Sequence, residues 1–106
     1  MKVFKFGGAS LKTAAGVRNV ASIIQSHKGN NLLVIVSAMG KTTDMLERVL
    51  NLSATGKEFD QTLSSLKKYH TEAITELFTD RTRVTQEIDA VFSNLEQQLK
   101  NNADFD

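Results

Sequence analysis

The 106-residue sequence contains no cysteine, no proline and no tryptophan. Without cysteine, the chain has no means to form a disulfide framework, a thiolate metal site or a cysteine nucleophile. The two histidines, His27 and His70, are too few and too far apart in sequence to suggest a histidine metal cluster. The sequence therefore predicts that the protein itself builds no metal site.

Long hydrophobic runs are also missing. The longest unbroken apolar run is Leu32–Val36, whereas a membrane-spanning helix needs about 20 apolar residues. The first residues show no apolar stretch followed by a small-residue cleavage site, so they do not resemble a secretory signal. We expect neither a membrane partner nor export.

Acidic residues are absent from the first part of the chain, where Asp44 is the first carboxylate. Six basic residues precede it: Lys2, Lys5, Lys12, Arg18, Lys28 and Lys41. Such a segment generates a field that attracts anions. The basic residues are scattered and the aromatic residues are few, so nucleic acid is not the expected partner.

The first half of the sequence has the pattern of two strands that alternate with two helices. Residues 2–6 and 32–36 are rich in β-branched and aromatic side chains and predict strands. The unbroken apolar run at 32–36 predicts a strand that is buried on both faces. Apolar residues at spacings of three and four predict a helix over 14–27, and a hydroxyl-rich, acidic start predicts another over 42–54. A βαβ crossover places the strands side by side and parallel. The loops that follow them then open at one edge, where such sheets bind ligands.

The second half of the sequence predicts two long amphipathic helices. Thr79-Asp80 lies between these helices as a candidate cap for the second. The apolar stripes at helical spacing are Phe59, Leu63, Leu66, Ala73 and Leu77 over 59–77, and Val84, Ile88, Val91, Leu95 and Leu99 over 84–99. Two such helices joined by a tight turn form an αα-hairpin. The polar end at 101–106 resembles a linker.

The segment KFGGAS at residues 5–10 has the composition of a phosphate-binding loop. Glycines allow backbone N–H groups to approach a phosphate, and a lysine beside them supplies a positive charge for a transferred group. The spacing matches neither G-x-x-x-x-G-K-[ST] nor G-x-G-x-x-G. On these grounds alone, a glycine pair after a strand is more often a tight turn than a phosphate site.

The same segment resembles the K-F-G-G-T-S signature of aspartate kinases, in the amino acid kinase superfamily. Residues 36–44, VSAMGKTTD, resemble the second loop of that family, V-S-A-x-x-x-x-T-[ND]. The two segments occur in the family's order, about thirty residues apart, and the resemblance covers about the first 55 residues. Ala9 stands where the family has threonine, which removes one hydroxyl from the first loop.

The resemblance implies a role for each matching residue. Lys5 would contact the ATP phosphates and act as the catalytic residue by stabilising charge during transfer. The other implied ATP-binding residues are Gly7, Gly8, Ala9 and Ser10, and the implied aspartate-binding residues are Ser37, Gly40 and Thr43.

The implied fold is α/β: a partial three-layer αβα sandwich with parallel strands and an appended αα-hairpin. Residues 1–57 would form the βαβα part with both loops, and residues 58–106 the hairpin of the same truncated domain. The chain is expected to be the N-terminal fragment of a longer enzyme and to be inactive alone.

The implied reaction transfers the γ-phosphoryl group of ATP, used with Mg²⁺, to the side-chain carboxylate of L-aspartate. This is the first step of lysine, threonine and methionine biosynthesis. The lack of targeting signals and the need for ATP predict a cytoplasmic location, and the resemblance implies a homo-oligomeric full-length enzyme. Two alternatives stay open: another amino acid kinase with a different acceptor, and a non-catalytic module whose hairpin binds a partner.

Overall fold

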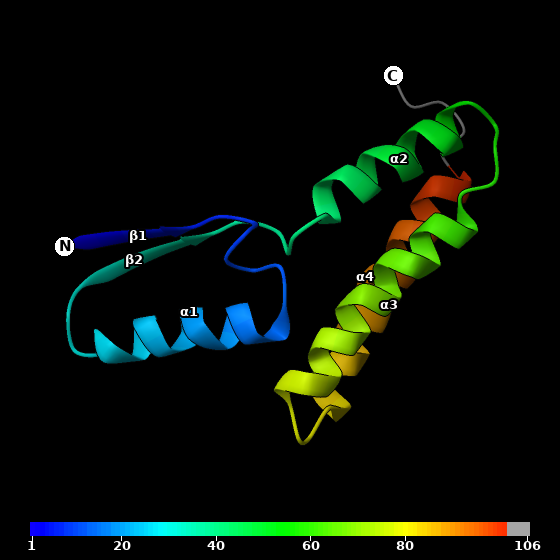
Figure 1. The fold of residues 1–106 in the computed structure, drawn as a ribbon. Helices are drawn as coiled ribbons and strands as arrows, with labels where there is room; N and C mark the ends of the chain where they lie inside the picture. Colours follow the sequence, from blue (N-terminus) through cyan, green and yellow to red (C-terminus); the bar gives the residue numbers. More distant parts are fainter. Residues whose placement is uncertain (102–106) are drawn as a thin grey trace. The chain divides into compact units, whose positions relative to one another are not determined.

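The computed structural model describes residues 1–101; the rest of the predicted linker, 102–106, lies outside the described residues. The elements along the chain are β1 (Lys2–Phe6), α1 (Ala14–Ser26), β2 (Leu32–Val36), α2 (Thr42–Ala54), α3 (Asp60–Leu77) and α4 (Thr82–Asn101) (Figure 1). Every predicted strand and helix is present, within a few residues of its predicted bounds. The chain forms two compact units, Met1–Thr43 and a second that begins at Asp44. The predicted division into 1–57 and 58–106 stays a prediction.

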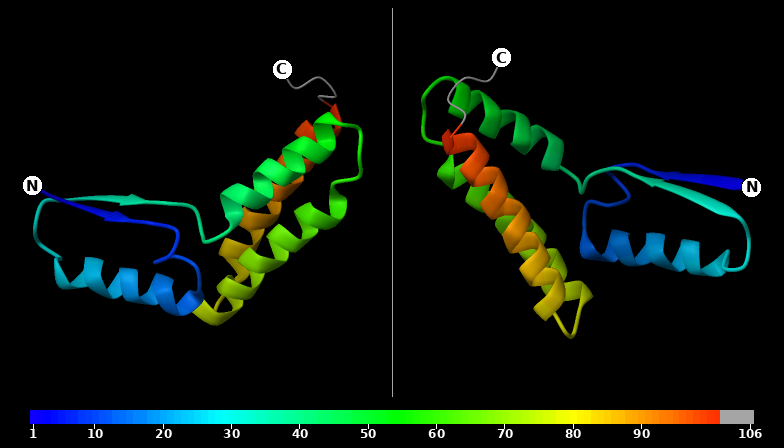
Figure 2. Two further views of the ribbon diagram at one scale, coloured as in Figure 1. Left: turned by 45° about the horizontal axis from the view of Figure 1, so that its top comes forward. Right: turned by 180° about the vertical axis from the view of Figure 1, so that it is seen from behind.

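The first unit is built on a parallel pair of strands, as predicted. β1 and β2 are in register from Lys2 opposite Leu32 to Phe6 opposite Val36. The Ser37 N–H group donates to the Phe6 carbonyl oxygen at 2.9 Å and so extends the ladder by one bond. Helix α1 runs along one face of this sheet (Figure 2). The two strands therefore end at the same edge.

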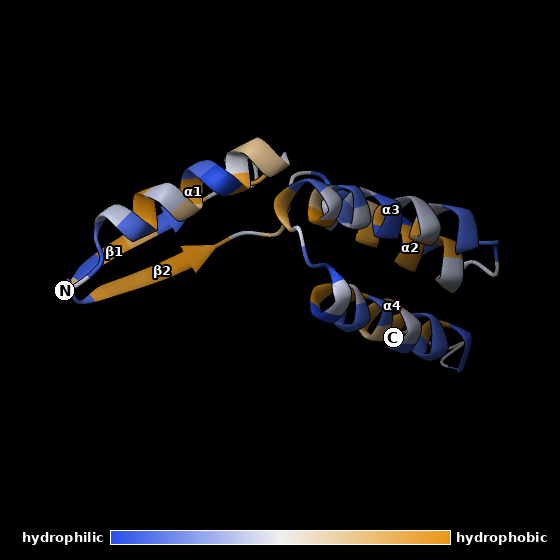
Figure 3. Cartoon of the chain, turned by 90° about the horizontal axis from the view of Figure 1, so that it is seen from below, coloured by the Kyte–Doolittle hydropathy of each residue, from blue (hydrophilic) through white to orange (hydrophobic). Residues whose placement is uncertain are grey.

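The other face of the sheet is open within the first unit. Val3, Leu33 and Ile35 point away from the half-buried Phe4 and Val34, and each is about half exposed. Figure 3 shows β2 as uniformly hydrophobic. The unbroken apolar run predicted a strand buried on both faces, and this expectation is wrong for the described residues. Only α1 packs on the sheet inside the first unit, and it covers one face.

Helix α1 has defined ends. The Thr13 hydroxyl oxygen accepts a hydrogen bond from the Gly16 N–H group at 3.1 Å, which caps the first turn. At the other end the His27 ring meets the Phe4 ring edge-on, with 4.7 Å between ring centres. His27 Nδ1 also lies 2.9 Å from the Ile23 carbonyl oxygen. The Thr13 cap fixes the start of the helix, and the contact between the His27 and Phe4 rings holds its end against β1.

The second unit has its own hydrophobic core, to which α2, α3 and α4 all contribute. Its buried members are Val49, Leu63, Leu66, Phe92 and Leu99. The hairpin of α3 and α4 is as predicted, and most residues of its predicted apolar stripes are buried or half-buried, whereas Val91 is exposed. Their burial does not favour the alternative of a module that offers an apolar stripe to a partner.

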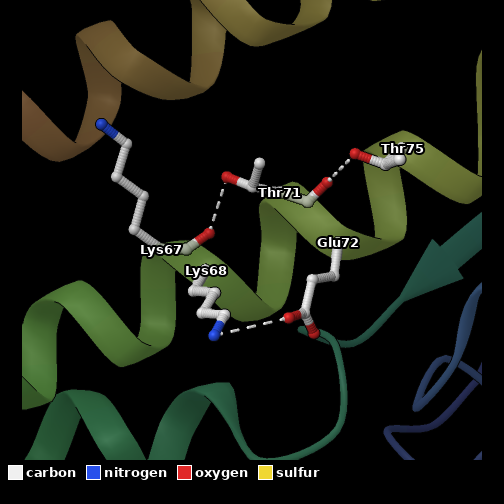
Figure 4. Close-up of polar contacts among 5 residues, drawn as sticks. All are labelled: Lys67, Lys68, Thr71, Glu72 and Thr75. Atoms are coloured by element: carbon white, nitrogen blue, oxygen red, sulfur yellow. Dashed lines mark hydrogen bonds and ion pairs between the residues drawn. The ribbon is translucent and has the colours of Figure 1, made fainter.

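Two lysines of α3 form ion pairs, one with α4 and one within α3. Lys67 Nζ lies 3.0 Å from Asp89 Oδ1 of α4, whereas Lys68 faces Glu72 on α3 itself (Figure 4). The Thr71 hydroxyl donates to the Lys67 carbonyl oxygen at 2.9 Å, and the Thr75 hydroxyl donates to that of Thr71 at 3.0 Å (Figure 4). These hydroxyls bond within the helix and need no further partner.

Asp80 caps the start of α4, and this cap makes a pH-dependent contribution to stability. The Thr82 N–H group donates to Asp80 Oδ1 at 3.1 Å. Hydrogen bonds from the backbone and side chain of Thr82 lower the pKa of the Asp80 carboxyl group. Because the folded-state pKa is the lower one, the contribution is present above the unfolded-state pKa, about 4, and is lost as the pH falls through the folded-state value.

We therefore expect Asp80→Asn to unfold at lower urea concentration than the parent chain at neutral pH. The difference should shrink on acidification and vanish below the folded-state pKa, where the parent is also uncharged. Urea unfolding of both proteins at several acidic pH values measures this difference in midpoint. A difference that stays constant with pH would show that the charge of Asp80 contributes nothing.

Candidate functional site

Two loops meet at the carboxyl-end edge of the sheet: the first loop, residues 7–10, and the second loop, residues 37–41. The glycine in the middle of their contact is Gly8. A Cβ atom on Gly8 would lie 3.4 Å from the Gly40 carbonyl oxygen and 3.7 Å from that of Ala38. The first unit thus brings the two loops together, as the parallel strands predicted.

The first loop is folded by two overlapping turns. The Ser10 N–H group donates to the Gly7 carbonyl oxygen at 3.1 Å, and the Leu11 N–H group donates to that of Gly8 at 3.2 Å. Leu11 is buried and anchors the end of the loop. The N–H groups of Gly7 and Gly8 donate none of the loop and turn hydrogen bonds within residues 1–101. Two neighbouring donors are therefore available to an anion.

Lys5 lies next to this loop, on the open face of the sheet. It is exposed and pairs in register with Ile35 of β2. Among the described residues it takes part in no ion pair. Ala9 and Ser10 of the first loop are exposed as well. The loop can thus combine an ammonium group with backbone donors.

The second loop ends in a turn that leads directly into α2. The Thr42 N–H group donates to the Met39 carbonyl oxygen at 2.9 Å. Gly40 has φ +41°, a conformation that glycine adopts with less strain than other residues. Ser37 and Thr43 are both exposed, one at the start of the loop and one in the first turn of α2. All the predicted site residues therefore belong to the first unit.

Two residues of this region were not found from the sequence. A Cβ atom on Gly16 would collide with the Ser10 carbonyl oxygen, so this glycine lets the first loop approach α1 closely. The sequence feature that could have revealed Gly16 is the presence of a glycine inside a helical pattern. Thr42 is only 8% exposed, and its hydroxyl oxygen is buried without a hydrogen-bond partner. The sequence gives no sign of this, because the neighbouring Thr43 is chemically identical and exposed.

The electrostatic character of the site is cationic. No acidic residue occurs in Met1–Thr43, which is the whole first unit. Within residues 1–101, no group of three or more histidine, aspartate or glutamate side chains is arranged to hold a metal ion. Over the same residues, none of the helices combines the length and hydropathy that a membrane span requires. The site is suited to an anion.

Known proteins resemble the chain over most of its length. The profile of the amino acid kinase family matches residues 1–103. Aspartokinase 2 of Arabidopsis thaliana, a chloroplastic protein, is 31% identical over 93 residues, which are 84% of this chain and 17% of the relative. The aspartokinase of Corynebacterium glutamicum is 52% identical over 46 residues, 42% of this chain and 11% of the relative.

A solved structure shows the same fold. The crystal structure of Clostridium acetobutylicum aspartate kinase matches with a TM-score of 0.72 at 30% identity, over 91% of this chain and 23% of that one. The chain spans less than a quarter of the length of these relatives. The predicted α/β fold of the amino acid kinase type is confirmed. With a family match over 1–103 and this structural match, the chain belongs to the amino acid kinase family.

Proposed function

We propose that the chain is the N-terminal part of an aspartate kinase, and that its two loops hold the phosphates of ATP and the acceptor L-aspartate. One observation supports this most directly: Gly8 and Gly40, from the two segments that resemble the family's signatures, lie so close that a Cβ atom on Gly8 would touch the Gly40 carbonyl oxygen. Phosphoryl transfer requires both substrates to be held a few ångströms apart and in line. Two loops in contact provide such a place.

The proposed reaction requires the protein mainly to position the two substrates and to stabilise charge. An oxygen of the aspartate side-chain carboxylate forms a bond to the γ-phosphorus, and the bond from that phosphorus to the bridging oxygen breaks. The electron pair leaves with ADP, and the product is an acyl phosphate. Because a carboxylate is already a nucleophile at neutral pH, no general base is needed. Lys5 and the N–H groups of Gly7 and Gly8 would stabilise the charge that moves.

Ala9 and Ser10 complete the proposed phosphate loop, and Ser10 offers the only hydroxyl there. The second loop and the first turn of α2 would hold L-aspartate: Ser37 of the loop and Thr43 of the helix would donate hydroxyl hydrogen bonds, and Gly40 shapes the turn between them. The described residues do not fit a magnesium ion held by protein carboxylates, because the first unit has none. A homo-oligomeric enzyme acting in the cytoplasm, where ATP is available, belongs to the same proposal.

The proposed function is tested by acceptor specificity. The intact kinase that contains this segment is assayed for ADP release with L-aspartate, L-glutamate, carbamate and phosphate as acceptors. We expect turnover with L-aspartate and background rates with the other three. Preference for any other acceptor would assign the protein to a different branch of the family.

Replacing Thr43 by alanine in that intact enzyme is expected to raise KM for aspartate about tenfold, the effect of one lost hydrogen bond to a charged group. The turnover number should change by a few-fold at most, because such a bond holds ground state and transition state alike. Thr75→Ala, which removes a hydroxyl bonded within α3, is the control. Equal KM values for both variants would exclude Thr43 from the aspartate site.

A further inference from the structure

The sulfur atoms of the chain all belong to methionines, because the sequence has no cysteine. Met1 is the first residue and is 88% exposed. Met45 lies on α2 and packs against the core of the second unit. Met39 lies in the second loop, next to Gly40, and is half-buried. One oxidisable thioether therefore belongs to the loop that we propose to hold the acceptor.

The backbone of Met39 is part of the turn that leads into α2. Its carbonyl oxygen accepts the 2.9 Å hydrogen bond from the Thr42 N–H group. Gly40, the next residue, has φ +41°, and its carbonyl oxygen would lie 3.4 Å from a Cβ atom on Gly8. A displacement of residue 39 would therefore move the turn that precedes Thr43 and borders the first loop.

Oxidation changes the surroundings that the side chain of Met39 can accept. A thioether is apolar and flexible, so it is readily half-buried, whereas a sulfoxide carries a polar oxygen that needs a hydrogen-bond donor or water. The sulfoxide oxygen is best solvated when the side chain turns out of its half-buried position, and this pulls on the backbone of a tight turn. Met1 lies outside every helix and strand, so the same change there would leave the site as it is.

We propose that Met39 is a site of reversible oxidation: a peroxide converts its thioether to the sulfoxide, and the altered loop binds the acceptor more weakly. The inference rests on the proposed function and deepens it, because it adds a means of regulation to the same site.

The oxidation is a transfer of one oxygen atom. The sulfur lone pair forms a bond to one peroxide oxygen, the O–O bond breaks, and the other oxygen leaves as water with the proton of the first. Sulfur thereby loses two electrons, and the peroxide gains them. A methionine sulfoxide reductase reverses the change with electrons from a pair of thiols, which become a disulfide.

The first test measures ADP release by the intact kinase before and after treatment with hydrogen peroxide, and each enzyme is compared with its own untreated rate. We expect oxidation to lower kcat/KM for aspartate at least about tenfold in the parent, since displacing a positioning group by about 1 Å is enough for a loss of that order. Met39→Leu, which nearly keeps the side-chain volume and has no sulfur, should keep most of its activity. A Met39→Leu enzyme that loses as much activity as the parent would overturn the inference.

Met45→Leu is the matched control, because it removes the other methionine that is not at the start of the chain. It should lose activity as the parent does, and methionine sulfoxide reductase with a dithiol should restore both enzymes. If Met45→Leu protected as well as Met39→Leu, or if the reductase restored neither enzyme, the inference would be wrong.

Met39→Gln imitates the sulfoxide without an oxidant, because it places a polar oxygen on a side chain of similar length. It should lower kcat/KM for aspartate relative to Met39→Leu. Equal values for these two variants would contradict the proposed effect of a polar group at this position.

The second test uses the 106-residue chain with Met45→Leu, labelled with ¹⁵N, in which Met39 and Met1 are the remaining methionines. Mass spectrometry of its peptides measures oxidation at Met39, and the amide resonances of Gly40 and Thr42 report on the turn. We expect these resonances to shift as Met39 is oxidised by hydrogen peroxide and to return after reduction. Unchanged resonances at full oxidation would overturn the inference and leave the proposed function intact.

The two tests also separate the inference from the proposed function. An untreated kinase without aspartate-dependent ADP release would overturn the proposed function and, with it, the weaker binding of the acceptor. The spectra of the 106-residue chain would then decide by themselves whether oxidation of Met39 rearranges the second loop.

Discussion

Replacing Lys5 by methionine in the intact kinase is expected to lower the turnover number at least 100-fold, or about 3 kcal/mol of transition-state stabilisation. Lys5 lies on β1, two residues before the glycine pair, with no ion pair among the described residues. Its charge is therefore available to the phosphoryl group in transfer. Because negative charge builds up on the oxygen that leaves with ADP as the phosphoryl group is transferred, the contact of Lys5 with the phosphates should strengthen in the transition state, and its loss should lower kcat more than it raises KM.

The measurement is steady-state kinetics of ADP release, with both substrates varied. Lys28→Met is the matched control, since it removes an exposed lysine of the same unit that lies beyond α1. It should stay within a few-fold of the parent. Circular dichroism checks that the Lys5 variant keeps its helices. A Lys5→Met enzyme with a turnover number close to that of its control would rule out the phosphate-loop assignment and the mechanism built on it.

The sequence predicted the framework of the site because local signals and topology agree there. β-Branched residues marked both strands, and helical spacing marked the crossover between them, so the parallel pairing followed from chain connectivity. Once the strands are parallel, their loops must share an edge. The contact between Gly8 and Gly40 confirms this. The role of each loop residue was predicted only through resemblance, since a glycine pair has no chemistry of its own.

Features that depend on tertiary packing could not be predicted from the sequence. An apolar run such as Leu32–Val36 predicts a strand able to be buried on both faces, but it does not say how many faces a neighbour covers. Thr42 is buried and its neighbour Thr43 is exposed, and residue type does not distinguish them. The approach of Ser10 to Gly16 depends on the path of the chain into α1. Identical residue types in adjacent positions thus acquire different roles.

The hairpin was easier to predict, because its core positions follow from helical spacing alone. Leu63 and Leu66 were part of the predicted stripe, and both are buried in the second unit. The Phe92 side chain was not in the predicted stripe of α4, although it is buried, while Val91, which was, is 61% exposed. A shift of one position turns a helical residue by about 100°. The error is confined to this one position, because Leu99 of the predicted stripe is buried and Ile88 and Leu95 pack against the core. It leaves the fold unchanged.

Leu66 is the position in this core where a substitution should have its largest effect on stability. It is 1% exposed and lies in the cluster formed by α2, α3 and α4. Leu66→Ala removes three carbon atoms from a packed site and leaves a cavity, which costs about 3–4 kcal/mol. A loss of this size is a large part of the 5–15 kcal/mol that typically stabilises a domain. We expect the urea concentration at the unfolding midpoint of the second unit to fall. The dependence of its free energy of unfolding on urea concentration should stay unchanged.

Tyrosine fluorescence measures this for the second unit alone, because the chain has one tyrosine, Tyr69, and no tryptophan. Tyr69 is partly buried and packs against the same core, so its emission follows the unfolding of that core. Val91→Ala is the control, since the 61% exposed Val91 side chain should contribute less than about 0.5 kcal/mol. If the two substitutions lowered the midpoint equally, the core would not be centred on Leu66, and the packing of α2 against the hairpin would need another explanation.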